Sequence, residues 1–331
     1  MTLPEIMIAL VISAVLLTGV IQVFISSKQS YRLLDANSRV QENGRFSIEY
    51  LTHDVRMAGY TGCFRGDTID VENILNDPNN FNWDLANPVE GNEWNAGGWT
   101  PALNAQIDGS VLNETDVLIT RGLDTDGIGL VDPFSDGAQL FVDAAGNNIN
   151  DGDIVMVTDC ERASIFQVTN QQVTGGGGSV NIVHSAANTV QPGNSTPQLV
   201  NSYGADAQVA RFVTNVYYIG TGNSGEPALF RRRLVGNSLV EQELVEGVEN
   251  MQVLYGEDID NDGIANRYVA ANVAAMANVV SIRISLLLRS MDNVTTAPQT
   301  YAYNGQNITA TDRRIRRVFT TTVKLRNRGL L

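Results

Sequence analysis

Cysteine and histidine, the side chains that most often bind zinc, are scarce in this sequence. Its 331 residues include two cysteines and two histidines, whereas a tetrahedral zinc site takes about four ligands. No CxxC pair occurs, and neither His53 nor His184 has a recognisable nucleophile or metal ligand near it in sequence. The GxSxG, P-loop and HExxH patterns are also missing. We therefore expect no enzyme activity, no catalytic residue and no required cofactor.

Basic residues are also few: 22 lysines and arginines stand against 36 aspartates and glutamates, giving a net charge of −14. Because phosphate contacts need a basic face, this balance argues against a general nucleic-acid-binding surface. Basic side chains do cluster at 231–233 and 313–328, where they alternate with or flank apolar residues. We interpret both clusters as solvated faces of strands.

One long hydrophobic run is present, at the start of the chain. Residues 3–25, LPEIMIALVISAVLLTGVIQVFI, contain one charged residue, Glu5, and one other strongly polar residue, Gln22. A helix of this length spans about 35 Å and can cross a hydrocarbon layer of roughly 30 Å. A cleaved signal peptide would begin with basic residues, and this run does not. A simple membrane anchor would leave the Glu5 carboxylate unpaired at a cost of several kcal/mol.

The N-terminal residues TLPEIMIAL, at positions 2–10, resemble the start of a mature type IV pilin or type II secretion pseudopilin. In these families a prepilin peptidase cleaves after a glycine and the new N-terminal residue is methylated, which implies processing and methylation at Met1. The fifth mature residue is then Glu5, whose carboxylate can neutralise the N-terminal amino group of a neighbouring subunit and set the subunit register. Met1 replaces the commoner phenylalanine. Pro4 is tolerated in a first helical turn.

The apolar pattern continues beyond residue 25 as an amphipathic one. Between 26 and 60, apolar or small residues recur every three or four positions, at Leu33, Ala36, Val40, Gly44, Ile48, Leu51 and Val55. This spacing predicts a single helix of about 55 residues, ending near Ala58 and Gly59 because glycine suits a helix C-cap.

The remaining residues favour β-structure. Residues 61–115 are rich in Gly, Asn, Asp and Pro, and we expect a long loop anchored by Trp83, Trp94 and Trp99 rather than a carbohydrate platform. Residues 238–255 fit either a helix or a strand. Strands are predicted at 116–121, 138–142, 153–158, 164–169, 179–183, 207–220, 228–235, 279–290 and 316–326.

These predictions give an α+β fold with a mainly antiparallel sheet. We expect a hydrophobic transmembrane or filament-core helix over residues 1–25, its amphipathic continuation over 26–60, and a β-rich globular head over 61–331. Cys63 and Cys160 are two in number and follow a segment that implies export, so a disulfide is expected in an oxidising compartment. Two separate buried thiols are the alternative.

Motifs along the head resemble PilW-like minor pilins and, more distantly, J-type pseudopilins. They are RMAGY at 56–60 with Gly62-Cys63, DC at 159–160 with ASIF at 163–166, VEGV at 245–248 with YG at 255–256, and RRVFTTTVKLRN at 316–327. The resemblance implies a disulfide between Cys63 and Cys160.

The sequence DIDNDGIAN at 258–266 matches part of a calcium-binding loop. Asp258, Asp260, Asp262 and Asn266 supply oxygen atoms at alternate positions, and Ile264 can offer its carbonyl. Position twelve is Val269 instead of the usual glutamate, so any Ca²⁺ site would be weak. The alternative is a solvated turn rich in Asp and Asn.

The resemblance implies a minor pilin that takes part in type IV pilus assembly or initiation, at or near the pilus tip. Its implied partners are major and minor pilins, met through the N-terminal helix, and the prepilin peptidase. Its implied location is the bacterial inner membrane, with the head in the periplasm, and afterwards the filament. A secretion pseudopilin and a membrane-anchored adhesin are the alternatives.

Overall fold

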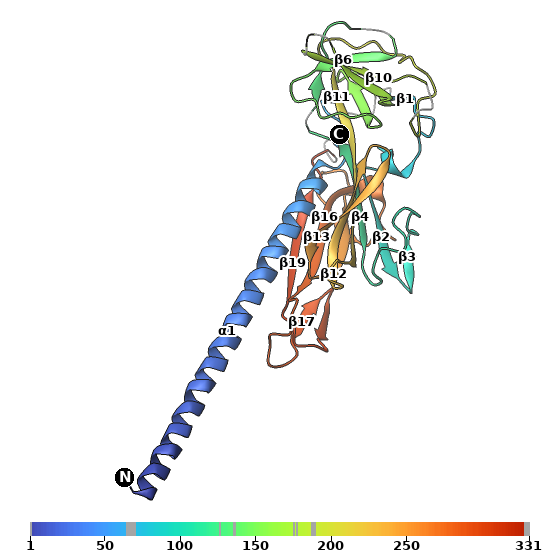
Figure 1. The fold of residues 1–331 in the computed structure, drawn as a ribbon. Coiled ribbons are helices and arrows are strands. Elements are labelled where there is room, and N and C mark those ends of the chain that lie inside the picture. Colours follow the sequence, from blue (N-terminus) through green and yellow to red (C-terminus); the bar gives the residue numbers. More distant parts are fainter. Residues whose placement is uncertain are drawn as a thin grey trace.

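One helix and a β-rich head make up the structure, which is a computed structural model (Figure 1). It describes residues 2–63, 71–125, 127–134, 137–174, 176, 178–186 and 190–327. Helix α1 (Leu3–Met57) is 55 residues long, and Ala58 is its C-cap. Gly59 follows at φ +75°, a conformation that glycine adopts without strain. The predicted long helix and its end are confirmed. Met1, the predicted processing site, lies outside the described residues.

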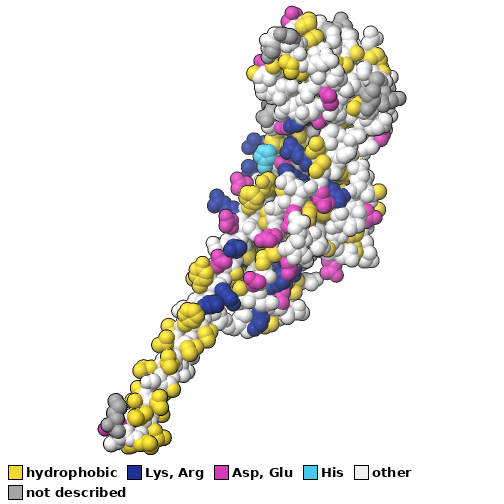
Figure 2. Space-filling model, in the orientation of Figure 1, with side chains coloured by type: hydrophobic (Ala, Val, Ile, Leu, Met, Phe, Trp, Pro, Cys, Tyr) yellow, Lys and Arg dark blue, Asp and Glu magenta, His cyan; other side chains and the backbone are white. Residues whose placement is uncertain are grey.

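The two halves of α1 differ in burial. Residues 2–34 are exposed around the whole helix, and Figure 2 shows this half as an apolar rod that projects from the head. It contains a window of mean hydropathy 2.6, so α1 is long and apolar enough to cross a membrane. In the second half one face is buried at Val40, Gly44, Ser47, Leu51 and Val55. This three-to-four-residue spacing is the period of an amphipathic helix.

The part of the head nearest α1 is a β-sandwich, which we call the proximal part. One sheet has the order β15-β14-β16-β19. Its strands are β14 (Val248–Glu257), β15 (Arg267–Val269), β16 (Val279–Arg289) and β19 (Arg316–Lys324), and they pair antiparallel. A short hairpin of β17 (Thr300–Tyr303) and β18 (Gln306–Thr309) lies at its lower end (Figure 1).

The other sheet is larger and runs through the whole head, in the order β1-β8-β7-β11-β4-β2-β3 with β5, β12 and β13 attached. The strands of its proximal half are β2 (Val89–Asn95), β3 (Gly98–Thr100), β4 (Val117–Leu123), β12 (Pro227–Val235) and β13 (Ser238–Glu246). Strand β11 (Gln208–Thr221) pairs with β7 and β5 at its start and with β4 and β12 further along. It therefore joins the proximal part to the end of the molecule farthest from α1.

That far end, at the top of Figure 1, is called here the distal lobe. It holds β1 (Val71–Asn73), β5 (Ile128–Gly129), β6 (Gln139–Asp143), β7 (Ile154–Thr158), β8 (Ala163–Gln167), β9 (Asn170–Val173), β10 (Ser179–Val183) and the start of β11. A small sheet, β6-β10-β9, packs with them. Strand β1 runs parallel to β8, and the other named pairs are antiparallel.

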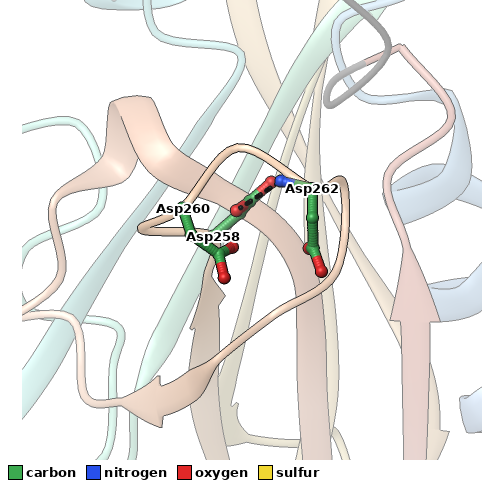
Figure 3. A group of neighbouring side chains, drawn as sticks. All are labelled: Asp258, Asp260 and Asp262. Atoms are coloured by element: carbon green, nitrogen blue, oxygen red, sulfur yellow. Dashed lines mark hydrogen bonds between the residues drawn. The ribbon is translucent and has the colours of Figure 1, made fainter.

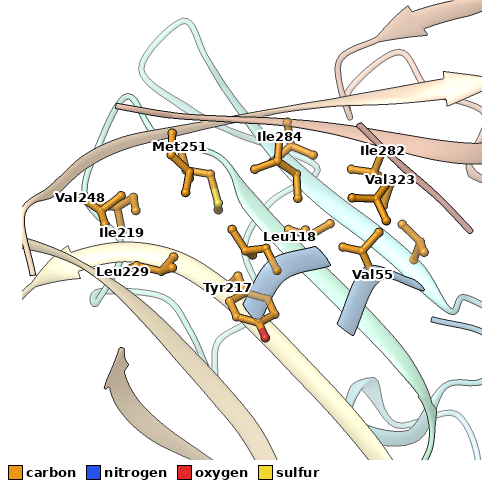
Figure 4. Packing of buried hydrophobic residues seen from close by; sticks show 14 of the residues in the cluster. Val55, Leu118, Tyr217, Ile219, Leu229, Val248, Met251, Ile282, Ile284 and Val323 are labelled. Atoms are coloured by element: carbon orange, nitrogen blue, oxygen red, sulfur yellow. The ribbon is translucent and has the colours of Figure 1, made fainter. Parts of the chain in front are cut away.

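Each end of the head has its own apolar core. In the proximal core, residues of α1 such as Leu51 and Val55 lie between the two sheets, against Tyr217, Ile282 and Val323 (Figure 4). The distal core contains Val142, Phe166 and Ile182 and no residue of α1. The helix therefore packs directly on the core at one end of the head and not on the core at the other.

The predicted fold class is confirmed, with two refinements. All nine predicted strands exist within a few residues of their expected bounds, and residues 238–255 form strands β13 and β14 rather than a helix. The expected long loop over 61–115 is wrong in part. It contains strands β1, β2 and β3 and a short 3-10 helix, Phe81–Trp83, because its segments complete the edge of the sheet beside β4 and β8.

Candidate functional site

The apolar half of α1 is the surface that the head cannot cover. Leu3, Ile8 and Leu16 are each exposed by more than half. Covering such a surface with lipid or with other apolar helices is favourable relative to leaving it in water, by roughly 25 cal/mol per Å² of apolar area. This half of α1 therefore fits a bilayer or a bundle of helices rather than water.

Glu5 lies in the first turn of this apolar surface. Its carboxylate accepts a hydrogen bond from the backbone N–H of Thr2 at 2.8 Å. The contact covers one of the free N–H groups at the helix start and places negative charge beside the positive end of the helix dipole. Glu5 is thus held by its own chain at the point where the predicted contact with a neighbouring N-terminus would occur. The register role of Glu5 stays a prediction.

The second half of α1 is fixed to the head by polar contacts around its apolar face. Near the helix end, Asp54 accepts a hydrogen bond from Tyr217 of β11, and the guanidinium of Arg231 lies 3.9 Å from the same carboxylate. Burial first, and then the charge of Asp54, raise the pKa of the Tyr217 hydroxyl well above its usual value. Earlier in the same half of α1, the side-chain amide of Asn43 donates a hydrogen bond to the carbonyl of Glu246 in β13. These contacts set the direction in which α1 leaves the head.

A disulfide joins the end of α1 to the distal lobe. Cys63 lies a few residues beyond the helix, and Cys160 is in the turn between β7 and β8; the structure links them across 97 positions of sequence. This is the pair that the sequence resemblance implies. Closing so long a loop restricts the unfolded chain by roughly 4 to 5 kcal/mol in the chain-entropy model. The disulfide therefore holds the distal lobe to the helix end.

The two arginine clusters are not simple solvated strand faces, and this part of the sequence interpretation needs correction. On β12, Arg232 pairs with Glu241 at 2.6 Å, and both Arg231 and Arg232 are 14% exposed. In the C-terminal cluster, Arg316 is 5% exposed and pairs with Glu249 and Asp312. These cations are largely buried because their acidic partners lie on strands of the same sheet, Glu241 on β13 beside β12 and Glu249 on β14 in the sheet of β19. The sequence does not reveal these strand positions.

Glu226 joins the same C-terminal network to β12. It accepts hydrogen bonds from Arg314 at 2.7 and 2.8 Å and another from Arg289. The hydrogen bonds from Arg314 are the main reason that the pKa of Glu226 falls to about 2. The ion pairs tie the start of β12 to the end of β16 and the start of β19, in the sheet β15-β14-β16-β19.

The acidic loop predicted to bind calcium lies between β14 and β15 (Figure 3). Carboxylate oxygens of Asp258, Asp260 and Asp262 lie within 4.8 Å of one another. Asp258 is buried and accepts the N–H groups of Asp262 and Gly263 at 3.3 and 2.7 Å, whereas Asp260 and Asp262 are exposed. Burial opposes ionisation of Asp258, but the N–H groups of Gly263 and its neighbours outweigh it, so the pKa of this carboxyl is lowered.

The rest of the predicted ligand set is partly assembled. Asn266 donates from its amide to Asp260 at 3.1 Å and accepts the N–H of Ile259 at 2.7 Å, so it closes the loop. Ile264 reaches the cluster through its N–H, which donates to the carboxylate of Asp262 at 2.8 Å. The three aspartates fit a weak cation site in charge and spacing. Calcium binding stays a prediction.

The tryptophans and histidines take the structural positions that were expected of them. Trp83 is buried in the 3-10 helix, and Trp94 and Trp99 pack edge to face across the β2–β3 hairpin with centroids 4.5 Å apart. His53 is exposed on α1, and His184 is fully buried against Phe166 in the distal lobe. The ring nitrogens of His184 have no hydrogen-bond partner among the described residues. Burial lowers the pKa of His184 to about 4.

Among the residues that sequence reasoning missed is a buried carboxylic acid of the proximal part, Asp116. Asp116, just before β4, is 2% exposed and accepts the N–H groups of Val253 and Trp94 at 2.8 and 3.3 Å. Burial first, and then the charge of Glu93, raise the pKa of Asp116 to about 7. Asp116 holds β4 and β14 together across the sandwich. The sequence offers only an aspartate before an apolar run, which is a common pattern at strand starts.

Comparison with known proteins adds one match. The family model described as type IV pilus-assembly protein W matches residues 216–327, from the second half of β11 to the end of β19. Searches of curated proteins and of solved structures return no match. The matched residues include the strands that hold α1. The match confirms the resemblance to PilW-type pilins over these residues and supports a part in type IV pilus assembly.

Proposed function

We propose that the chain is a minor pilin, a structural subunit that enters a type IV pilus or the complex that initiates pilus assembly, at or near the tip. The observation that carries the proposal is the apolar half of α1, exposed on every side and followed directly by a half that is locked to the head. A helix built in this way can exchange lipid for the helices of neighbouring subunits while the head stays folded. The match to a pilus-assembly family supports the same role.

The proposed route begins in the bacterial inner membrane. The apolar half of α1 would span the membrane with the head in the periplasm, and a prepilin peptidase would generate a methylated residue at Met1. The subunit would then leave the membrane and meet major and minor pilins through α1. Pairing of Glu5 with the terminal amino group of a neighbour would remove an unpaired charge from the apolar bundle. No catalytic step by this chain is needed for any of these events.

Mass spectrometry of sheared and purified pili tests this function. We expect peptides of this chain at low stoichiometry, with the most N-terminal one starting at a methylated Met1. The matched sample is a pilus preparation from cells that lack the chain. If the chain stays entirely in the inner membrane while pili are made, the minor-pilin assignment is wrong and a membrane-anchored adhesin is favoured. If its deletion blocks protein secretion but leaves pili intact, the chain is a secretion pseudopilin.

A further inference from the structure

Two long strands, β13 and β19, are edge strands of their sheets and lie beside α1. Among the strands that the structure describes, β13 pairs only with β12, and β19 pairs only with β16. The helix contacts both: Asn43 reaches the carbonyl of Glu246 in β13, and Arg317 of β19 reaches Asn37. Each strand therefore has one edge without a strand partner. Such an edge can accept a further strand from another chain.

The register of β19 shows which of its backbone groups point outward. Leu325 donates its N–H to Val280, so Leu325 directs its backbone toward β16. Because the direction alternates along an antiparallel strand, Val318, Thr320 and Thr322 direct their N–H and C=O groups away from β16. Their side chains are exposed as well.

The chain closes only the first position of this edge. Arg316 also points outward, and Gln299 takes the place of a partner strand there. Its side-chain oxygen accepts the N–H of Arg316 at 2.8 Å, and its amide donates to the carbonyl of Arg316 at 3.1 Å. Among the described residues, no group bonds to the outward backbone of Val318, Thr320 or Thr322. The edge of β19 is therefore covered at Arg316 and open from Val318 to Thr322.

Strand β13 protects its edge in a different way. The two-residue turn at 236–237 makes Val235 and Ser238 the closing pair of the hairpin, so Leu239, Glu241 and Glu243 are the outward positions. Two of these three carry a charge, which discourages pairing with a further strand. The segment 318–323 of β19, VFTTTV, contains neither charge nor proline and is rich in β-branched residues. The comparison selects β19 as the edge suited to pairing.

A groove lies along this edge, between β19 and α1. It has a volume of about 750 Å³ and is lined by Ser38, Glu42, Arg45, Arg317, Val318 and Phe319. Arg317 lies 3.5 Å from the amide oxygen of Asn37, and neither Arg45 nor Arg317 has an ion-pair partner among the described residues. In a chain with a net charge of −14, this groove offers two unpaired guanidinium groups. It is therefore complementary to a strand that carries a carboxylate.

We propose that the free edge of β19 accepts an extended strand of a neighbouring pilus subunit, with a carboxylate of that strand meeting Arg45 and Arg317. This inference rests on the proposed function, because it places the chain beside other pilus subunits. The added strand continues the sheet β15-β14-β16-β19 by one member, and the groove holds its side chains against α1. The contact therefore joins two heads in addition to the packing of their apolar helices.

Two substitutions at one residue test the backbone contact in full-length protein in piliated cells. Thr320→Pro removes an N–H that points away from β16, so the pairing of β19 with β16 is kept. Thr320→Ala removes the same side chain and keeps the N–H. A photoreactive amino acid at Thr322 then reports the neighbour, which is identified by mapping the cross-linked peptides. We expect cross-links to a strand of another pilus subunit in wild type and Thr320→Ala, and at least a fivefold lower yield in Thr320→Pro.

A charge variant makes the test independent of the proline. Arg45→Glu lies on the exposed face of α1 and should leave the melting temperature unchanged, while it lowers the cross-link yield by a similar factor. If Thr320→Pro lowers the melting temperature, its cross-link yield is set aside and the yield of Arg45→Glu alone tests the strand contact. Equal cross-linking in all variants, with the wild-type chain present in sheared pili, overturns the strand contact and leaves the minor-pilin function standing. A wild-type chain absent from sheared pili overturns both.

Discussion

The proximal part and the distal lobe share a continuous sheet but differ in what supports them. The proximal part packs its core on α1, and its strands from β12 to β19 lie within the family match at 216–327. The distal lobe has a separate core, takes no residue from α1, and lies outside that match. The family-like portion of the chain is thus the portion that holds the helix.

The largest expected effect comes from Glu5, which concerns assembly and not the stability of either part. Glu5→Ala removes the carboxylate from the exposed half of α1, where it accepts the backbone N–H of Thr2. We expect at least a tenfold loss of the chain from sheared pili, because an incoming subunit would leave its amino group unpaired in an apolar bundle. The melting temperature in detergent should not change. The matched control is Gln22→Ala, a polar deletion in the same segment. Equal incorporation of the Glu5 variant and wild type would remove the register argument.

Leu51→Ala tests the dependence of the proximal part on α1. Leu51 is fully buried in the proximal core, so its truncation leaves a cavity between the sheets. We expect the free energy of unfolding to fall by about 2 to 5 kcal/mol. Leu34→Ala, which removes the same atoms from a residue that is 68% exposed, should change it by less than about 0.5 kcal/mol.

Hydrogen exchange then locates the effect of Leu51→Ala. Protection should fall first in β14 and β16, which pack on the helix, and less in β6 and β10 of the distal lobe. A uniform loss in both regions would show that they unfold as one unit, and the comparison between them would fail.

The parts of the fold that sequence predicts are those set by local periodicity. The apolar spacing from Leu33 to Val55 determines the buried face of α1, and β-branched runs locate the long strands. The apolar spacing of residues 238–255 fits either a helix or a strand. These residues form strands because they pair with β12 and β16. Strand β2 was missed because its residues become a strand only by pairing with β4.

For the site, the family resemblance pointed to Glu5 and the cysteine pair, and the spacing of aspartates pointed to the acidic loop; all three are marked by short motifs. It could not find contacts between residues that are distant in sequence and ordinary in type. Glu226 and Arg314 are 88 positions apart, and Asp116 reaches the N–H of Val253 across 137 positions. The open edge of β19 depends on which strands lie beside it, a property of the topology that no local pattern contains.

Between pH 7 and pH 4, acid should weaken the distal lobe relative to the proximal part, where carboxyls of lowered pKa such as Glu226 cost stability only below about pH 5. In the distal lobe the pKa of His184 is lowered from 6.5 to about 4, so the unfolded chain binds more protons as the pH falls through this range, and the lobe loses stability. In the proximal part the pKa of Asp116 is raised from 3.8 to about 7, so the folded chain binds more protons over the same range and gains stability. Local acid sensitivity should therefore appear first in the distal lobe.

Hydrogen exchange measured between pH 7 and pH 4, corrected for the intrinsic rates, checks this difference. Amides of β10 should lose protection relative to those of β14 as the pH falls. His184→Leu should remove most of the change in β10, and His53→Gln, a substitution of the exposed histidine, should leave it in place. An unchanged β10 profile in the His184 variant would assign the acid sensitivity to another group.

The smallest expected effect is that of calcium on the loop between β14 and β15, in the proximal part. Three carboxylates within 4.8 Å repel one another, and a divalent cation would offset that repulsion. Because the ion would bind the folded loop and not the unfolded chain, millimolar Ca²⁺ should raise the melting temperature of the full-length protein in detergent by about 2 to 4 °C relative to chelator.

Asp258 supports the loop backbone, so the variant to use is Asp260→Asn with Asp262→Asn, which changes the two exposed carboxylates. This variant should lose the shift, whereas Asp108→Asn, an exposed acid outside the loop, should keep it. Equal melting of the wild-type protein in calcium and in chelator would make residues 258–266 an ordinary turn, held by the hydrogen bonds of Asp258 and Asn266 alone.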